Sequence, residues 1–462
     1  MNIILLSGGS GKRLWPLSNE VRSKQFLKIF KKGNTGNNSK ESGLKESMVQ
    51  RMYRMIREVA PDSVITIATS KDQIPQIQSQ LGDNINISIE PCRKDTFPAI
   101  ALASAFLHDK LDVDKNEAVV VCPVDPYVEE DYFECLKRLS DEVDKTDKTA
   151  SDKAGLVLMG IQPTYPATKY GYIIPAEVSA SVSNVLSFKE KPDEKTAEAY
   201  IAQGALWNGG VFAFKLDYIL SIASSLLGSS DYDSLYNNYE SLNRISFDYA
   251  VAEKEKHIRV IRFNASWKDL GTWNTLTDAM DEPTTGNAIA QDCTNTHVIN
   301  ELSLPLVALG MKDCVIAATH DGILVSDKEK STQLKDVLNK DIAFSDSRPM
   351  YERRTWGEYK VLDYKLHKDN QNSLVKELII SPGQHISYQR HSHRTEIWTF
   401  TEGAGELILD GKIKRVVAGD VAIIKPGMKH AIKGLTEFHI IEVQLGDELT
   451  EDDIERLTWD WV

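Results

Sequence analysis

The chain has 462 residues, of which 42% are hydrophobic and 26% charged, as is ordinary for a globular protein of two or three domains. A net charge of -13 without a Lys/Arg-rich block argues against nucleic acid or a membrane surface as partner. No apolar run approaches the roughly 18 residues that a membrane span needs. The five cysteines lack C-x-x-C spacing, which predicts free thiols and a cytoplasmic protein.

The first 280 residues alternate between short apolar runs and helical patterns. Spacing of apolar residues predicts helices within 46–60 and 97–109, and two polar stretches predict exposed loops at 31–45 and 141–153. The alternation predicts an α/β fold with a mostly parallel sheet. The predicted buried strands cover residues 2–7, 64–69, 118–123 and 154–161.

The pattern changes after this region. Short strand-like runs with polar turns begin near Pro283, and residues 331–343 predict a linker helix. Beyond Arg348 the chain is rich in strands with recurring glycine turns, which is typical of a small β-sandwich or barrel. We therefore predict three parts, with boundaries 1–282, 283–347 and 348–462.

A glycine-rich loop, SGGSGKR, follows the first predicted strand. Such a loop presents backbone N–H groups to an anion. It is not a P-loop, because Leu6 stands where that motif requires glycine and Arg13 stands where it requires Ser or Thr. It is not the dinucleotide fingerprint either, because Leu14 occupies the last glycine position.

The longer motif G-G-S-G-x-R-L-W-P-L-S…K-Q-F resembles the nucleotide-binding signature of sugar-nucleotide pyrophosphorylases. It is most similar to mannose-1-phosphate guanylyltransferases of the long bacterial type, which are fused to a mannose-6-phosphate isomerase domain. The resemblance covers nearly the whole chain. It implies a Rossmann-like, GT-A-like nucleotidyltransferase domain, a short β-rich linker domain and a C-terminal all-β cupin barrel. Further motifs in the family's order are EPCRKDTFPAIALA, PVDPYV, YPATKYGYI, FKEKPD, WNGGVFAF, FDYAVAEK and WKDLGTW.

This resemblance implies transfer of GMP from GTP to mannose 1-phosphate, giving GDP-mannose and pyrophosphate. The attacking sugar phosphate is already an anion, so the protein needs to position two polyanions and neutralise their charge rather than supply a base. Arg13 and Lys24 match the family's cations, of which Arg13 faces the triphosphate. Asp125 and Asp269 match its Mg²⁺ ligands, in agreement with the preference of Mg²⁺ for oxygen. Trp15 is expected to be structural.

Other positions match the family's binding residues, with two departures. Pro126 stands where most relatives have His, and Asp95 replaces the Asn of R-N-T. Asp248 fits a helix N-cap and a site residue equally well. The resemblance assigns Gly8, Gly9, Gly11, Arg93 and Thr96 to the nucleotide. It assigns Gly171, Tyr172, Glu190, Lys191 and Asn208 to the sugar phosphate.

The stretch QRHSHRTEIW carries the second constellation. On an extended strand His391 and His393 share a face, and Glu396 and the later His430 complete a site for Zn²⁺ or another divalent transition metal. Six of the ten histidines follow residue 360. The spacing resembles a cupin metal site, and the sequence is similar to the family's isomerase domain, which implies that Arg394 lies near the sugar phosphate.

The isomerase would interconvert mannose 6-phosphate and fructose 6-phosphate through a metal-stabilised enediolate. Ile397 replaces a His frequent in relatives, and the tail lacks their terminal Tyr-Gly-Arg. Two alternatives therefore stay open: a guanylyltransferase with an inactive or regulatory cupin, and a non-catalytic sensor of sugar nucleotides. The intact cations and metal aspartates argue against the sensor. We also expect a homo-oligomer.

Overall fold

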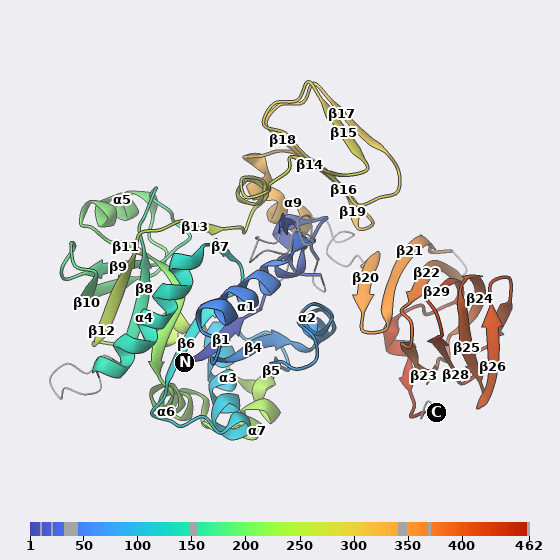
Figure 1. Ribbon diagram of the computed structural model, residues 1–462, viewed down its shortest axis with the longest axis horizontal. Coiled ribbons are helices and arrows are strands. Elements are labelled where there is room, and N and C mark those ends of the chain that lie inside the picture. Colours follow the sequence, from blue (N-terminus) through green and yellow to red (C-terminus); the bar gives the residue numbers. More distant parts are fainter. Residues whose placement is uncertain are drawn as a thin grey trace. The chain divides into compact units, whose positions relative to one another are not determined.

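The computed structural model (Figure 1) describes the chain in seven segments. By their internal contacts, they form two units: Met1–Gly11 with Ser23–Glu282, and Lys12–Arg22 with Pro283–Val462. Most of the predicted loop at 31–45 and the linker near 345 lie outside the described residues. Those residues are 1–9, 12–19, 22–31, 45–146, 155–340, 349–367 and 371–459.

The first unit is built on a nine-stranded sheet in the order β5-β4-β1-β6-β11-β8-β12-β10-β9. The four predicted strands correspond to β1, β4, β6 and β8, which confirms the α/β class. The bounds are β1 Asn2–Leu6, β4 Val64–Ser70, β5 Asn86–Glu90, β6 Ala118–Pro123, β8 Leu156–Ile161, β9 Tyr172–Pro175, β10 Val182–Lys189, β11 Leu206–Lys215 and β12 Ile258–Phe263.

The sheet is less parallel than the sequence predicts. Strands β5, β4, β1 and β6 run parallel, but β11 runs antiparallel to both β6 and β8. Antiparallel neighbours need no helical crossover, so the strand–helix alternation that indicates parallel pairing is lost after β8. A separate two-stranded ladder pairs β7 (Pro126–Val128) with β13 (Trp267–Asp269).

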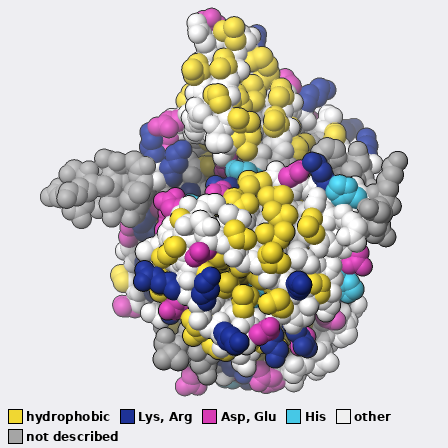
Figure 2. Space-filling model, turned by 90° about the vertical axis from the view of Figure 1, so that its right-hand side faces the viewer, with side chains coloured by type: hydrophobic (Ala, Val, Ile, Leu, Met, Phe, Trp, Pro, Cys, Tyr) yellow, Lys and Arg dark blue, Asp and Glu magenta, His cyan; other side chains and the backbone are white. Residues whose placement is uncertain are grey.

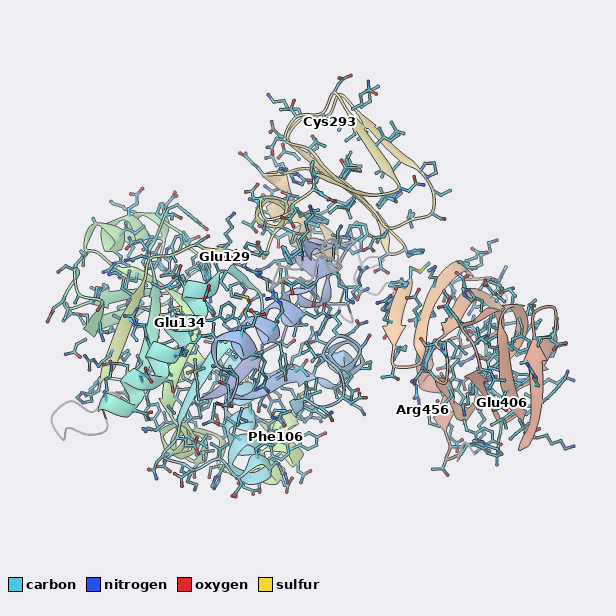
Figure 3. The ribbon with its side chains drawn as sticks, viewed as in Figure 1. Phe106, Glu129, Glu134, Cys293, Glu406 and Arg456 are labelled. Carbon is cyan, nitrogen blue, oxygen red and sulfur yellow. The ribbon has the colours of Figure 1, made fainter. Side chains whose placement is uncertain are left out.

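Helices cover both faces of this sheet, which explains why its central strands β1, β6 and β8 are apolar and buried over nearly their whole length. On one face Ile3 and Leu5 pack with Met52 of α1 and Leu136 of α4, and on the other face Ile4 packs with α3 and α6. Phe106 on α3 contacts the ring of Tyr232 on α7 (Figure 3). The bounds are α1 Met48–Val59, α2 Ile74–Leu81, α3 Thr96–Leu111, α4 Glu130–Thr146, α5 Glu194–Ala202, α6 Leu216–Leu227, α7 Tyr232–Asn237 and α8 Trp273–Thr277.

The predicted exposed connection at 141–153 is wrong over its first six residues. Helix α4 continues to Thr146, because Val143 extends the apolar stripe of Leu136 and Leu139 by one turn and is buried. Asp141, Asp144 and Lys145 occupy the solvent side of that turn, whereas Glu142 is buried and pairs with Arg259. The many charges of this segment hide its helical spacing. Residues 147–154 lie outside the described part of the chain.

The second unit begins with a small solenoid. Strands β14, β16 and β18 stack in parallel on one side, β15 and β17 pair in parallel on another, and β19 closes against β18. The predicted linker helix is present as α9 (Leu334–Lys340). The strands are β14 Thr284–Gly286, β15 Ala288–Gln291, β16 His297–Asn300, β17 Leu306–Leu309, β18 Cys314–Thr319 and β19 Gly322–Asp327.

The stretch that follows the glycine loop belongs to this solenoid. Thr319 donates its hydroxyl hydrogen to the Pro16 carbonyl (3.0 Å), and Arg22 forms a bidentate ion pair with Glu301 (2.7 Å for both contacts). The absent side chain of Gly322 leaves the space that the Trp15 ring occupies. Trp15 therefore serves packing, as expected from the sequence.

The rest of the second unit is a barrel of two antiparallel sheets, β20-β21-β22-β29-β24-β27 and β26-β25-β28-β23-β30. Alternate residues of these strands, such as Leu374, Trp398 and Ile440, fill the interior. The all-β prediction is confirmed. The bounds are β20 Tyr351–Arg354, β21 Gly357–Lys365, β22 Asn372–Ile380, β23 His385–Arg390, β24 Arg394–Glu402, β25 Ala404–Leu409, β26 Lys412–Val417, β27 Val421–Ile424, β28 His430–Gly434, β29 Phe438–Gly446 and β30 Glu455–Arg456.

Two further sequence predictions concern the chain as a whole. All five cysteines are free thiols, among them Cys293 on the solenoid (Figure 3). Within the described segments, no helix combines the length and apolar character needed to cross a membrane. The three-part division into 1–282, 283–347 and 348–462 stays a prediction, because the contact-based units assign Lys12–Arg22 to the later part of the chain.

Candidate active sites

The glycine loop leaves its backbone open beside the end of β1. Gln25 donates an amide hydrogen to the Ser7 carbonyl (3.0 Å), and the Ser23 hydroxyl donates to the Gly9 carbonyl (3.0 Å). A methyl group at Gly8 or Gly9 would meet no other atom within 4 Å, so packing does not require glycine there. What glycine provides is backbone N–H groups that an anion can approach closely.

A pocket of about 400 Å³ opens beside this loop. Pockets of this size accommodate small organic ligands. Its wall contains Gly8, Gly9, Arg93 and Thr96, the four described residues that the resemblance assigns to the nucleotide, and also Asp125. The structure thus brings these predicted residues together around one space. Gly11, the fifth, lies outside the described residues.

Glu90 and Arg244 also line this pocket and were not predicted. Burial raises the pKa of Glu90 to about 7, although its carboxylate accepts a hydrogen bond from the Tyr239 hydroxyl (3.1 Å). Such a carboxylate can accept hydrogen bonds from a bound base. A sequence signal existed for Glu90, which is a carboxylate at the carboxyl end of the parallel edge strand β5. Ligands bind at that end of parallel strands.

The Lys24 ammonium group lies between the two predicted metal aspartates. Its Nζ is 2.6 Å from Asp125 Oδ2 and 3.8 Å from Asp269 Oδ1. Lys169 Nζ lies 3.2 Å from Asp269 Oδ2, and the Tyr170 hydroxyl donates to the same carboxylate. Burial acts to raise the pKa of Asp269, but Lys24 and Lys169 hold this pKa below its usual range. Both aspartates are therefore ready to hold a hard cation.

The short ladder of β7 and β13 brings these aspartates together. Asp269 is opposite Pro126, the residue after Asp125, in the register of the two strands. Proline is tolerated there because it opens the strand, so the departure from His leaves the aspartate pair intact. Arg13 lies on the 3₁₀ turn Lys12–Leu14 in the second unit and is exposed. Its role at the triphosphate stays a prediction.

A second pocket, of about 220 Å³, contains three of the predicted sugar-phosphate residues: Gly171, Glu190 and Asn208. Glu190 Oε2 is buried and has no hydrogen-bond partner among the residues that the structure describes. A methyl group at Gly171 would come within 2.5 Å of that oxygen, so glycine is required to seat Glu190. A buried acceptor of this kind fits a ligand that brings its own donors, as the hydroxyls of a sugar do.

Asp248 also lines this pocket, which favours its role as a site residue over an N-cap alone. Its Oδ1 accepts a hydrogen bond from Asn208 Nδ2 (2.6 Å), and it begins the π-helix Asp248–Ala252. Single π-helical turns are frequent at functional sites. Burial, and then the negative charge of Glu190, raise the pKa of Asp248 to about 6. The pocket thus contains a carboxylate, Asp248, that binds a proton more tightly than an exposed aspartate does.

The last two predicted sugar-pocket residues lie differently. Lys191 is half exposed and pairs with Glu190 (Nζ to Oε1, 2.6 Å). Tyr172 is buried in the core, where its hydroxyl donates to the Ala167 carbonyl (2.9 Å) and accepts from Trp207 Nε1 (3.1 Å). The Tyr172 ring therefore supports the pocket from behind, and its side chain is not positioned to face a ligand.

Pro123 and Asp125 belong to the walls of both pockets. The two spaces therefore meet at Asp125, beside Lys24. A nucleotide in the larger pocket and a sugar phosphate in the smaller one would bring their phosphates to this junction.

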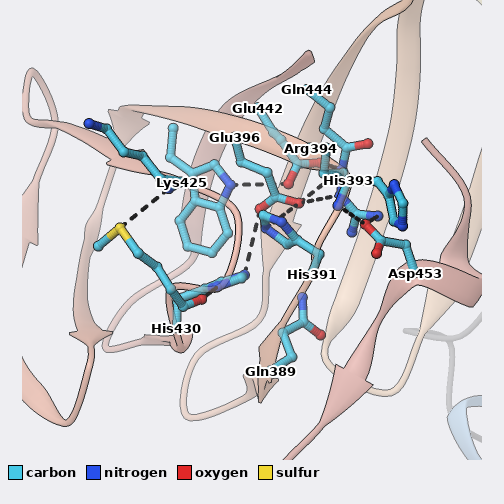
Figure 4. A network of polar contacts seen from close by, with 12 residues as sticks. Gln389, His391, His393, Arg394, Glu396, Lys425, His430, Glu442, Gln444 and Asp453 are labelled. Carbon is cyan, nitrogen blue, oxygen red and sulfur yellow. Dashed lines mark hydrogen bonds and ion pairs between the residues drawn. The ribbon is translucent and has the colours of Figure 1, made fainter. Parts of the chain in front are cut away.

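The barrel contains a separate cluster, formed by His391, Glu396 and His430 (Figure 4). His391 Nε2 lies 3.3 Å from Glu396 Oε1, and His430 Nε2 lies 3.6 Å from Glu396 Oε2. These three side chains are at most 1% exposed. Within the described part of the chain, His430 Nε2 and Glu396 Oε2 have no hydrogen-bond partner, and His391 Nε2 faces the Glu396 carboxylate. Orphaned, converging donor atoms of this kind fit a divalent metal ion.

Arg394 packs against this cluster instead of projecting into a pocket. Its Nε donates to Glu396 Oε1 (2.9 Å) and its Nη1 to the Thr450 carbonyl (2.9 Å). Burial acts to raise the pKa of Glu396, but His391, His430 and Arg394 hold this pKa far below its usual range. His391, His430 and Arg394 together keep Glu396 ionised, and a role of Arg394 at the sugar phosphate stays a prediction.

His393 is not part of the cluster. Its ring is half exposed, with Nδ1 3.4 Å from Asp447 Oδ1. Strand alternation predicts that it lies beside His391, but β23 ends at Arg390 and both histidines lie in the turn before β24. Alternation does not apply within a turn. His393 as a metal ligand therefore remains only a prediction.

Comparison with known proteins agrees with both sites. Residues 2–286 match the family described as nucleotidyl transferase, and residues 346–459 match mannose-6-phosphate isomerase C-terminal. The chain is 31% identical to the xanthan biosynthesis protein XanB of Xanthomonas campestris pv. campestris, over 98% of this chain and 97% of that protein. It is 29% identical to a mannose-1-phosphate guanylyltransferase of Salmonella montevideo, with 98% of each chain covered.

A solved structure shares the fold of the larger part of the chain. The crystal structure described as mannose-1-phosphate geranyltransferase from Thermus thermophilus has a TM-score of 0.60 and 28% identity, over 73% of this chain and 98% of that one. The chain thus belongs to the nucleotidyl transferase family and carries a mannose-6-phosphate isomerase C-terminal domain.

Proposed function

We propose that this enzyme transfers GMP from GTP to mannose 1-phosphate, releasing pyrophosphate and forming GDP-mannose. The observation that carries the proposal is the junction at Asp125, where a pocket suited to a nucleotide meets a pocket suited to a sugar, beside a lysine and two carboxylates. The relatives named as mannose-1-phosphate guanylyltransferases support the choice of substrates.

The proposed reaction joins the phosphate oxygen of the sugar to the α-phosphorus of GTP, and the bond to pyrophosphate breaks. The glycine loop donates backbone hydrogen bonds to the triphosphate, and Lys24 neutralises charge where the phosphates meet. Glu190, Asp248 and Asn208 orient the hexose through its hydroxyls. Alignment of two bound anions is the main requirement, because the nucleophile needs no deprotonation.

Mg²⁺ is the proposed cation at Asp125 and Asp269, where it would supply charge neutralisation at the phosphates. The paired carboxylates fit this ion, and Lys24 occupies the space between them in the structure. On the nucleotide side, the Glu90 carboxylate offers acceptors for the N–H groups of a guanine. Guanine presents two adjacent donors to a carboxylate, its ring N1–H and its amino group, whereas adenine, cytosine and uracil each present one donor group at that edge, and this supports GTP.

For the C-terminal domain we propose interconversion of mannose 6-phosphate and fructose 6-phosphate. His391, Glu396 and His430 would hold a divalent transition metal, with Zn²⁺ as the leading candidate, which supplies Lewis acidity toward the substrate oxygens. His391, His430 and Arg394 together hold Glu396 ionised for that role, and Arg394 donates a hydrogen bond to its Oε1. The resemblance of residues 346–459 to the isomerase family supports this second activity.

The proposals are tested together with one preparation. Pyrophosphate release is measured for a panel of nucleoside triphosphates against sugar 1-phosphates, with and without Mg²⁺. Fructose 6-phosphate formation is measured in parallel, with a series of divalent metals. Pyrophosphate release that occurs equally well without Mg²⁺ and without a sugar 1-phosphate would contradict the first proposal. No isomerisation with any metal would favour a structural or regulatory barrel.

We also propose a cytoplasmic homo-oligomer. Apolar side chains gather on the solenoid surface (Figure 2), where Ile289, Val307 and Leu309 on β15 and β17 are each more than 60% exposed. Contiguous exposed apolar side chains are frequent at protein interfaces. Light scattering across a concentration series measures the oligomeric state, and a monomer throughout would contradict this proposal.

A further inference from the structure

The smaller pocket, which the proposed function assigns to the sugar phosphate, is strongly acidic. Four carboxylates line it, those of Asp125, Glu190, Asp248 and Asp269. A sugar 1-phosphate carries about two negative charges of its own near neutral pH. These carboxylates therefore repel it unless a cation lies beside the phosphate. Among the described residues that line this pocket, Lys169 is the only cation.

Lys169 lies at the end of the pocket where the phosphate must be placed. Its Nζ is 3.2 Å from Asp269 Oδ2, and Oδ1 of the same carboxylate is 3.8 Å from Lys24 Nζ. Because Asp125 lines both pockets and contacts Lys24, this end is the junction with the nucleotide pocket. The phosphate oxygen of the sugar must reach the α-phosphorus of the nucleotide at this junction.

The Lys169 ammonium group can contact a second anion. It has three N–H donors, and one carboxylate, that of Asp269, lies within ion-pair distance of it. Its side chain is 44% exposed and lies over the Tyr170 ring, with Nζ 4.8 Å from the ring centre. The Tyr170 hydroxyl also donates to Asp269 (3.3 Å). Asp269 therefore stays in place when the ammonium group turns toward a phosphate.

We infer that Lys169 binds the phosphate of the sugar 1-phosphate, as a second cation beside Lys24. The inference rests on the proposed function. The two lysines differ in position, because Lys24 contacts Asp125, which lines both pockets, whereas Lys169 lines the smaller of the two. Lys24 thus serves the phosphates of both substrates, and Lys169 serves the sugar phosphate alone. Loss of the Lys169 charge should weaken the binding of one substrate selectively.

Steady-state kinetics of the full-length chain test this inference. The variants are Lys169→Met, which removes the charge at similar length, and Lys169→Arg, which keeps it. We expect Lys169→Met to raise the KM for mannose 1-phosphate about tenfold or more, as the loss of a charge-assisted contact does, and to leave the KM for GTP unchanged. Lys169→Arg should recover most of this loss. In the reverse reaction, Lys169→Met should raise the KM for GDP-mannose but not the KM for pyrophosphate.

Lys110→Met is the matched control. Lys110 is 39% exposed, pairs with Asp233 (2.9 Å) and lies 5.3 Å from the centre of the Tyr232 ring, but it lines neither pocket. Both KM values of this variant should equal those of the unchanged chain. Thermal unfolding measures whether each variant folds. If Lys169→Met does not fold, Lys169→Gln removes the same charge with a polar side chain.

The outcomes separate this inference from the proposed function. An unchanged chain without pyrophosphate release that depends on mannose 1-phosphate would overturn the proposed function and the inference with it. Transfer by the unchanged chain, with a normal KM for mannose 1-phosphate in Lys169→Met, would overturn only the role of Lys169. An equal rise in both KM values, or a greater Mg²⁺ requirement with an unchanged KM, would show that Lys169 acts by holding Asp269. Either result would also overturn the inference.

Discussion

Lys24 is the residue on which the transferase site converges, because its ammonium contacts Asp125 and approaches Asp269. It joins the glycine-loop region to two segments that lie 101 and 245 positions further along the sequence. A cation at this position both balances the carboxylates in the free protein and is available to phosphates when they bind.

Lys24→Ala should reduce turnover by about a hundredfold, because one charged contact to the reacting phosphates is lost. Pyrophosphate release at saturating substrates measures this effect. Lys31→Ala is the matched control, since Lys31 is half exposed and pairs with Glu282. Equal turnover in the two variants would remove Lys24 from the reaction centre.

Asp248 makes a pH-dependent contribution to stability. Its pKa is raised to about 6 by burial and by Glu190, whereas in the unfolded chain it would lie near 4. The native state therefore binds a proton more tightly, so this carboxyl lowers stability as the pH rises from about 4 through 6, and the cost is complete above that range.

Asp248→Asn should therefore raise the melting temperature at pH 8 and change it little at pH 4. The same variant should raise the KM for the sugar phosphate, because a hydroxyl-binding carboxylate is lost. Calorimetry at the two pH values and steady-state kinetics provide the measurements. A stabilisation that is largest at pH 4 would show that the Asp248 carboxyl does not destabilise the protein as the pH rises. An unchanged KM would show that Asp248 has a structural role only.

At the scale of elements, the turn between β23 and β24 positions the barrel site. Asp453, on the 3₁₀ turn Glu451–Asp453, accepts hydrogen bonds from the backbone N–H groups of Ser392 (2.9 Å) and His393 (3.1 Å). The C-terminal segment, whose sequence departs from that of relatives, thus holds the turn that carries His391.

Asp453→Ala should weaken metal binding by about tenfold, because groups that orient a ligand contribute on that scale. Asp447→Ala is the control, since Asp447 is exposed and contacts only the side chain of His393 in this turn. Metal dialysis compares the two. Weaker binding in Asp447→Ala than in Asp453→Ala would show that His393, and not the turn, controls the site.

At the scale of the whole molecule, the two candidate sites lie in different units, each with its own core. Because each site has its own core, we expect a substitution in one site to remove the activity of that site and to leave the other activity intact. His391→Ala should abolish isomerisation and metal binding while guanylyl transfer continues at a comparable rate, and Lys24→Ala should do the reverse. Pyrophosphate release and fructose 6-phosphate formation, both measured on each variant, test this expectation. Loss of transfer in a folded His391→Ala protein would show that the sites are coupled.

Much of this architecture was predictable from the sequence because it depends on local patterns. Apolar runs located β1, β4, β6 and β8, and the residues of the resemblance identified a large part of the polar lining of both pockets. At the end of α4 many charged residues hide the helical spacing of the apolar ones, and the sequence therefore predicted that the helix ends too early.

The tertiary structure decided what depends on neighbours distant in the chain. The placement of Lys24 between Asp125 and Asp269 requires the order of the sheet and the β7–β13 ladder. The packing of residues 12–22 with the solenoid has no local signal. Alternation along a strand ends where the strand ends, so only the folded barrel shows that the His393 ring lies toward Asp447 while His391, Glu396 and His430 converge.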